Sequence, residues 1–161
     1  MDTEALIALL QGSLYMIIVY AVFLVYTLAT GRQSITNLIF GLYFALLLSI
    51  EFPFYGLIQG GAKDSHMQSI LMIIVFAAFT VAMTFLFSRI LPREYSERTF
   101  EAFWQKLLLS AGATILVMAF SYHALPVTDL ITPGSQIQYL FGSDSSFFYW
   151  LITPLAILFI A

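Results

Sequence analysis

Residues 5–30 form a run without a single Asp, Glu, Lys or Arg, in which Leu, Ile, Val, Ala and Tyr predominate. The hydrocarbon core of a bilayer is about 30 Å thick, and roughly 20 apolar residues span it in a helix that rises about 1.5 Å per residue. The run exceeds this length. It predicts a transmembrane helix, because a backbone inside lipid must satisfy its hydrogen bonds internally.

Further apolar runs follow along the chain. Three of them are long enough to span a bilayer, and a shorter fourth, near the end of the sequence, lies at the lower limit. The expected spans are 5–30, 35–56, 69–90 and 107–125, with a short fifth at 145–161 that either spans or re-enters. The predicted fold class is all-α, a polytopic transmembrane helical bundle that forms one domain over residues 1–161.

The composition agrees with lipid as the solvent of this chain. Of its 161 residues, 61% are hydrophobic and 9% are charged, whereas a soluble domain carries about a quarter charged residues. Cysteine is absent, which excludes disulfides and thiolate metal sites. The net charge of −3 includes no basic block, which argues against nucleic acid as a partner. The expected partners are the lipid bilayer and either another membrane protein or further copies of the chain.

Basic residues are distributed unevenly among the loops expected between these spans. Five of the six lie in the first and third loops: Arg32, Arg89, Arg93, Arg98 and Lys106. The sixth, Lys63, lies in the second loop. Because cytoplasmic loops are enriched in Lys and Arg, we expect the N-terminus outside the cytoplasm. No basic residue precedes the run 5–30, so we interpret it as a retained anchor and not as a cleavable signal peptide.

Glu51 is the one ionisable residue well inside an expected span. An intramembrane carboxylate is costly and marks a functional site by default. Glu51 is therefore a candidate proton or cation site, helped by Pro53, which frees a backbone carbonyl one turn earlier. In the alternative interpretation, Glu51 lies about 24 Å from the inner end of its helix, close to the outer surface, and the helix ends at the proline. We favour this alternative.

Three further polar residues lie at or beyond the outer ends of the expected helices. His66, His123 and Asp129 form, together with Glu51, a candidate outer-face polar cluster. The sequence lacks the H-x-x-x-H and H-E-x-x-H spacings of metal sites. It also lacks the motifs of nucleophile elbows, P-loops and dinucleotide-binding turns. We therefore expect ordinary interfacial residues, with no metal, no cofactor and no enzymatic activity.

An amphipathic pattern covers residues 93–106. Three aromatic side chains, Phe100, Phe103 and Trp104, share one face of a predicted helix, and charged residues occupy the rest. In one interpretation this helix lies in the plane of the cytoplasmic membrane surface, with its tryptophan at headgroup level. In the other, a partner protein docks on it. We favour the in-plane helix.

Small residues recur at a spacing of four on two of the expected spans. The pairs are Gly41 with Ala45, Gly56 with Gly60 at the outer end of the same span, and Ala78 with Ala82. Such pairs allow two helices to approach closely. They serve either the bundle or an oligomer, and we favour the bundle because so short a chain needs them for its own packing.

The order of these parts resembles the colicin V production (CvpA) family of small bacterial inner-membrane proteins. The resemblance rests on an acidic start before the first span, the basic turn Gly31-Arg32, two further spans, and a fourth span followed by a loop and an aromatic tail. The turn here reads Thr30-Gly31-Arg32-Gln33-Ser34 and lacks the Gly-Phe element usual in that family. The resemblance implies a bacterial cytoplasmic membrane and an envelope or secretion role, and it assigns no functional residue.

Two functions follow from these features. The first is a non-enzymatic scaffold or accessory subunit of an envelope, secretion or pilus-type complex, which the lack of catalytic motifs favours. The alternative is a small transporter or channel subunit that uses Glu51 as its coupling group. A membrane enzyme ranks third, because it would require Glu51, His66, His123 and Asp129 to converge on one pocket.

Overall fold

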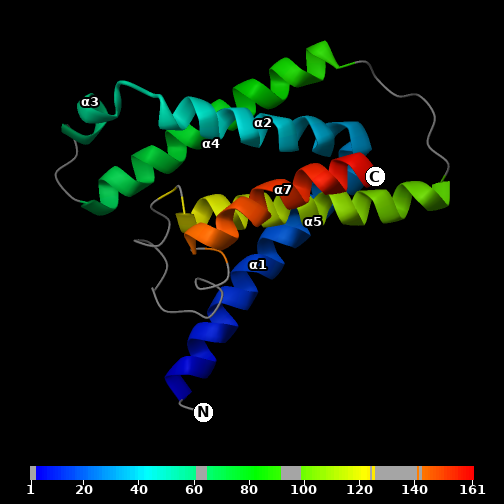
Figure 1. Cartoon of the computed structure of the whole chain (residues 1–161), viewed down its shortest axis with the longest axis horizontal. Coiled ribbons are helices and arrows are strands. Elements are labelled where there is room, and N and C mark those ends of the chain that lie inside the picture. Colours follow the sequence, from blue (N-terminus) through cyan, green and yellow to red (C-terminus); the bar gives the residue numbers. More distant parts are fainter. Residues whose placement is uncertain (1–2, 61–64, 92–98, 124, 126–140, 142) are drawn as a thin grey trace.

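The computed structural model describes residues 3–60, 65–91, 99–123, 125, 141 and 143–161. Every regular element in these ranges is a helix, as predicted (Figure 1). The helices are α1 (Thr3–Thr30), α2 (Arg32–Ile50), α3 (Tyr55–Gly60), α4 (Ser65–Ile90), α5 (Thr99–His123) and α7 (Asp144–Ile160). Among the described residues, α1, α2, α4 and α5 are long and apolar enough to cross a membrane. The chain is an integral membrane protein.

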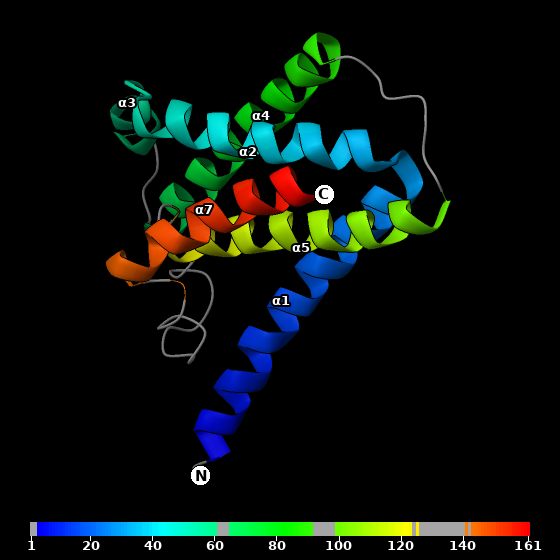
Figure 2. The same ribbon diagram turned by 45° about the vertical axis from the view of Figure 1, so that its right-hand side comes forward.

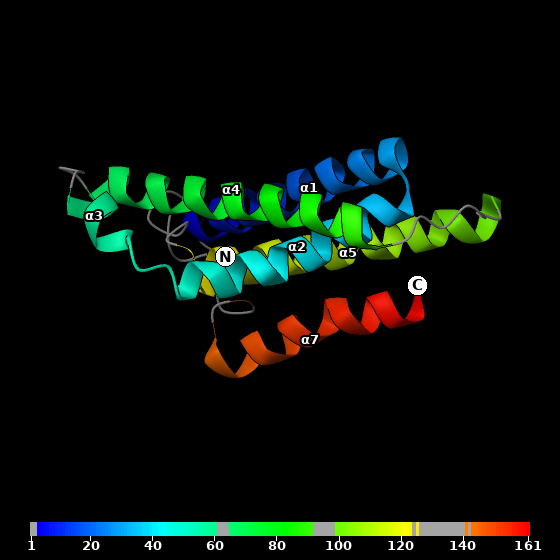
Figure 3. The same cartoon turned by 90° about the horizontal axis from the view of Figure 1, so that it is seen from above.

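The helices pack in three layers, which Figure 3 shows from above. The middle layer consists of α2 and α5, with α1 and α4 on one side and α7 on the other. Burial follows this order: 44% of the residues of Arg32–Ile50 and 50% of Phe103–Tyr122 are buried, against 6% of Ser13–Thr30 and 11% of His66–Ile90. The two outer helices α1 and α4 therefore present most of their apolar side chains to lipid.

Long helices that follow one another run in opposite directions, so their ends gather in two sets. The end of α4, the starts of α2 and α5 and the C-terminus lie at one end of the bundle (right in Figure 1). Arg32, Arg89 and Lys106 belong to the helix segments at this end, which we call the basic end. The end of α2, the start of α4, the end of α5 and the start of α7 lie at the opposite end. Lys63, Arg93 and Arg98 fall outside the described residues.

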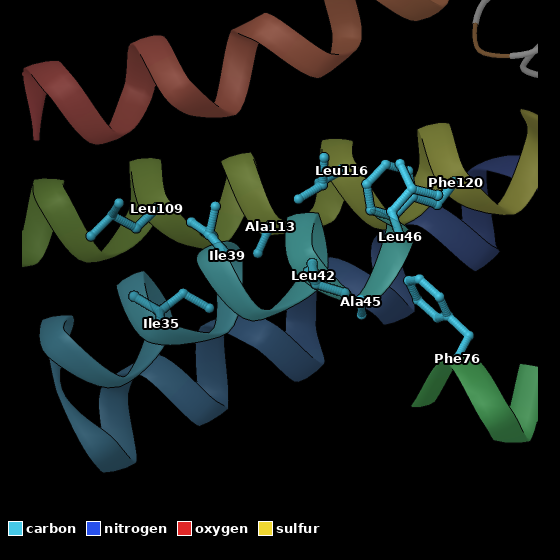
Figure 4. Close-up of a cluster of buried hydrophobic side chains, with 10 residues drawn as sticks. All are labelled: Ile35, Ile39, Leu42, Ala45, Leu46, Phe76, Leu109, Ala113, Leu116 and Phe120. Atoms are coloured by element: carbon cyan, nitrogen blue, oxygen red, sulfur yellow. The ribbon is translucent and has the colours of Figure 1, made fainter. Parts of the chain in front are cut away.

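The core forms where the two middle helices meet (Figure 4). Aliphatic residues of α2 and α5 face each other, and Phe76 of α4 and Phe120 of α5 meet edge to face with ring centroids 5.9 Å apart. The buried residues are Ile35, Ile39, Leu42, Ala45 and Leu46 of α2, Phe76 of α4, and Leu109, Ala113, Leu116 and Phe120 of α5. Because lipid is as apolar as these side chains, close packing rather than hydrophobic transfer holds the helices together.

Two turns fix the ends of α2. Gly31 is the single residue between α1 and α2, and its backbone has φ 90° and ψ 170°. Residues with a Cβ rarely adopt such a positive φ. At the other end, α2 stops at Ile50, earlier than the predicted span 35–56. The reason is Pro53, which cannot donate a backbone hydrogen bond and clashes with a carbonyl one turn earlier. A separate short helix, α3, follows from Tyr55.

The amphipathic segment 93–106 does not form a helix separate from the fourth span in the described part. Its residues 99–106 are the first turns of α5, which continues without a break to His123. No glycine or proline interrupts residues 99–111, so nothing in this stretch stops the helix. The fourth span therefore begins before the predicted residue 107.

The last helix, α7, runs alongside α5 over the length of the bundle despite an internal proline, Pro154 (Figures 1 and 2). A proline in a helix removes the backbone hydrogen bond to the carbonyl four residues earlier. The hydroxyl of Tyr43 on α2 donates to the carbonyl oxygen of Leu151, in the turn that precedes this proline. This bond joins α2 to α7 next to the proline.

Gly41 marks the closest approach between α2 and α4. A Cβ placed there would lie 2.9 Å from the backbone nitrogen of Thr84 and 3.2 Å from the carbonyl oxygen of Thr80. Ala45, its partner in the predicted pair, is fully buried, so this pair serves the bundle as expected. Ala78 and Ala82 are exposed on α4 instead, and the expectation that they pack within the bundle is wrong.

We expect Gly41→Ala to lower the free energy of unfolding by about 1–3 kcal/mol, the usual cost of overpacking. The cost arises because the added methyl group meets the backbone of α4, which cannot move aside as a side chain can. Thermal unfolding in mild detergent measures it. The matched control is Gly112→Ala on α5, where the new Cβ would meet only the side chain of Ile157 at 3.4–3.7 Å. Equal stability of both variants would contradict the close approach.

Candidate functional site

Glu51 lies at the very end of α2, as the C-cap residue with φ −91° and ψ 6°. Its side chain is exposed. The 19 residues of α2 extend over roughly 28 Å, close to the thickness of the hydrocarbon core. Glu51 therefore follows a helix that is by itself about long enough to cross the hydrocarbon core, which places it near one end of the span.

The turn that carries Glu51 is held by aromatic side chains. The ring of Phe52 lies 5.1 Å from that of Tyr55 and 5.3 Å from that of Phe79 on α4, measured between centroids. The hydroxyl groups of Tyr55 and Ser49 form a hydrogen bond of 2.8 Å. These contacts pin the turn after α2 against α4, which gives Pro53 and its aromatic neighbours a structural role.

The predicted outer-face cluster is described only in part. His66, in the first turn of α4, is exposed, and His123 is the last residue of α5. Both helix ends lie at the same end of the bundle as Glu51 (Figure 1). Within the part of the chain that the structure describes, no three His, Asp or Glu residues gather as metal ligands. Asp129 lies outside the described residues.

The predicted docking residues lie in the first turns of α5, which extend beyond the other helices at the basic end in all three overall views (Figures 1–3). Phe103 is 48% exposed and Trp104 is 60% exposed. The side chain of Phe100 is outside the described residues. Next to these aromatics, Arg32 at the start of α2 donates a hydrogen bond of 3.0 Å to the side-chain oxygen of Gln105. This bond holds the projecting turns against α2.

A row of polar side chains joins α1 to α5 along the length of the bundle, and we call it the polar seam. It consists of the hydrogen bonds Tyr15–Ser121 at 3.1 Å and Thr27–Ser110 at 2.9 Å. Ser110 and Thr27 are fully buried, and Ser121 is nearly so. In lipid, such bonds between helices fix both the choice of neighbour and the rotation of each helix.

The two hydroxyl groups in the middle of the seam share one acceptor on α1. The carbonyl oxygen of Phe23 lies 2.6 Å from the hydroxyl of Thr27 and 3.4 Å from that of Ser110, and it can only accept. In the bond between the two side chains, either hydroxyl can be the donor. Ser110 of α5 is thus bonded both to a side chain and to the backbone of α1.

Sequence reasoning missed this seam, although a signal for it exists. Ser110, Thr114 and Ser121 fall within about 40° of one another on a helical wheel, on an otherwise apolar span. Ser110 and Thr114 lie at the two ends of a stretch of small residues, 110–114. A polar stripe on one face of a span indicates a polar partner helix, but it does not say which helix that is.

Comparison with known proteins gives no match: no family model, no curated protein and no solved structure is similar to this chain. The function therefore has to be argued from the chain's own geometry.

We expect Glu51→Gln to change the free energy of unfolding by less than about 0.5 kcal/mol, because the side chain is exposed after the last turn of α2. The matched variant Ser49→Ala, two residues earlier, removes the bond to Tyr55 and should cost about 1 kcal/mol. Detergent unfolding measures both. A loss in Glu51→Gln larger than that in Ser49→Ala would show that the carboxylate is buried in the protein.

A double-mutant cycle tests the seam. Thr27→Val and Ser110→Ala should each destabilise the protein, and their coupling energy should be about 0.6–1.7 kcal/mol, the range of hydrogen bonds between membrane helices. Thr153→Val is the control, because its hydroxyl donates to the Tyr149 carbonyl within its own helix at 2.8 Å. Its effect should simply add to that of Ser110→Ala. Additivity of the first pair would refute the interhelical bond.

Proposed function

We propose that this protein is a non-enzymatic membrane scaffold or accessory subunit of an envelope, secretion or pilus-type complex. The projecting start of α5 carries the proposal. There Phe103 and Trp104 are 48% and 60% exposed, at the end of α5 that extends beyond the other described helices (Figure 1). Large aromatic side chains of this kind are the residues that anchor protein–protein interfaces.

The rigidity of this projection supports docking over simple surface exposure. The hydrogen bond from Arg32 to Gln105 and the continuity of α5 with the buried core hold the helix turn that carries both aromatic residues. A preformed anchor loses little conformational entropy on binding. A position of Trp104 at headgroup level is compatible with docking, because it would fix the distance from the membrane surface at which a partner binds.

The charge bias of the loops supports a cytoplasmic location for this projection. With the N-terminus outside, the basic end faces the cytoplasm, and a partner would meet α5 at the inner membrane surface. The layout resemblance to the colicin V production family supports a bacterial cytoplasmic membrane and an envelope or secretion process.

The alternative function, a small transporter or channel subunit coupled through Glu51, needs a carboxylate within the span. The position of Glu51 after the last turn of α2 favours a carboxylate near the membrane surface over one within the span. The scaffold is therefore the better-supported proposal.

We expect the double variant Phe103→Ala/Trp104→Ala to lose its partner. Two interface anchors together contribute enough binding energy that recovery of the partner should fall about tenfold or more. The measurement is purification of the tagged chain from mild detergent after cross-linking in cells, with co-purified membrane proteins quantified by mass spectrometry.

The matched control is Phe148→Ala/Tyr149→Ala, which removes two exposed aromatic side chains from the start of α7 at the opposite end of the bundle. This control should retain the partner. The proposal fails if the unmodified chain is repeatedly recovered alone as a monomer. It also fails if both double variants lose the partner equally, since the loss would then not depend on the start of α5.

A further inference from the structure

An open groove runs along the outside of the bundle between α1 and α4, with α2 as its floor. Its volume is about 480 Å³. Its walls include Val22 and Tyr26 of α1, Leu38 of α2, and Val81, Phe85 and Ser88 of α4. In each helix these residues fall in the half nearer the basic end. The groove therefore opens into the leaflet at that end, on the face of the bundle opposite α7 (Figure 3).

The hydroxyl groups on the α4 wall of the groove, those of Thr84 and Ser88, are already used by the backbone of α4. Thr84 donates to the carbonyl oxygen of Thr80 at 2.7 Å, and Ser88 donates to that of Phe85 at 2.6 Å. Such back-bonding consumes the proton of each hydroxyl. The groove accordingly presents an apolar surface, which suits a hydrocarbon occupant.

The short length of the groove favours a lipid over a helix. Its wall on α4 extends from Val81 to Ser88, which is about 10 Å at 1.5 Å per residue, whereas the hydrocarbon core is about 30 Å thick. A partner helix that crosses the bilayer would extend far beyond the groove. An acyl chain occupies one leaflet only and matches a groove confined to one half of the bundle.

A positive charge stands at the membrane-surface end of the groove. The guanidinium carbon of Arg89, in the last turn of α4, lies 5.0 Å from the ring centroid of Phe85, which lines the groove. Arg89 is exposed. Guanidinium groups bind phosphate in a bidentate manner through their planar set of N–H donors. An acyl chain in the groove would therefore bring a lipid phosphate to this arginine.

We infer that the groove between α1 and α4 binds one anionic phospholipid, with an acyl chain against Phe85 and Val81 and its phosphate at Arg89. The inference goes beyond the proposed scaffold function and does not depend on it. It predicts that an anionic headgroup is preferred, because the charge at the groove mouth adds to the apolar fit.

The test uses the full chain in mild detergent, with native mass spectrometry after addition of phosphatidylglycerol or phosphatidylcholine. The unmodified chain should retain one phosphatidylglycerol in preference to phosphatidylcholine. Arg89→Gln should weaken phosphatidylglycerol binding about fivefold, the usual contribution of one basic residue at an anionic membrane surface. Arg89→Lys should keep most of the preference, because it keeps the charge.

A second pair of variants tests the groove itself. Ser88→Trp fills the groove and should lower the retention of both lipids. Leu86→Trp places the same side chain on α4 at an exposed residue outside the groove lining, and should bind lipid as the unmodified chain does. Equal retention of the two lipids by the unmodified chain, or unchanged binding by both Arg89→Gln and Ser88→Trp, would overturn the inference. Loss of a protein partner but not of lipid in Ser88→Trp would likewise assign the groove to a protein.

Discussion

Lipid offers no hydrogen-bond partner, so the polar groups in the spans of this protein must find partners within the protein. Most hydroxyl groups do so within their own helix: Thr80, Thr84, Thr114 and Thr153 each donate to a carbonyl four residues earlier. Only a few are then left to join helices. The positions of those few decide which helices become neighbours, because apolar side chains alone do not distinguish a helix from lipid.

Three pairs of helices are held together by three different kinds of contact. Ser110 and Ser121 attach α1 to α5 through hydroxyl bonds, and Tyr43 attaches α7 to α2 through a backbone carbonyl near Pro154. The pair α2 and α4 uses Gly41 instead, where the absence of a Cβ lets two backbones touch. The middle position of α2 follows from these contacts, since it packs against α4 on one side and α5 on the other.

Hydropathy predicts the spans well because the bilayer imposes one length on all of them. It does not locate their ends, because these depend on local backbone chemistry. Pro53 indicated an early end of α2, but the predicted span continued past it. Which helices pack against each other is even harder to predict from the sequence. Gly41 and Ala78 look alike in the sequence, but one faces α4 and the other faces outward. For the candidate site, the sequence identified Glu51 and Trp104, whereas the seam required knowledge of which helices meet.

The second half of α1 links the two surfaces at the basic end. Phe23 and Tyr26 face the groove toward α4, while Thr27 is bonded to Ser110 on α5, the helix whose first turns carry the exposed aromatic residues. This stretch of α1 therefore lines the groove and also holds α5, whose first turns carry the exposed aromatic residues.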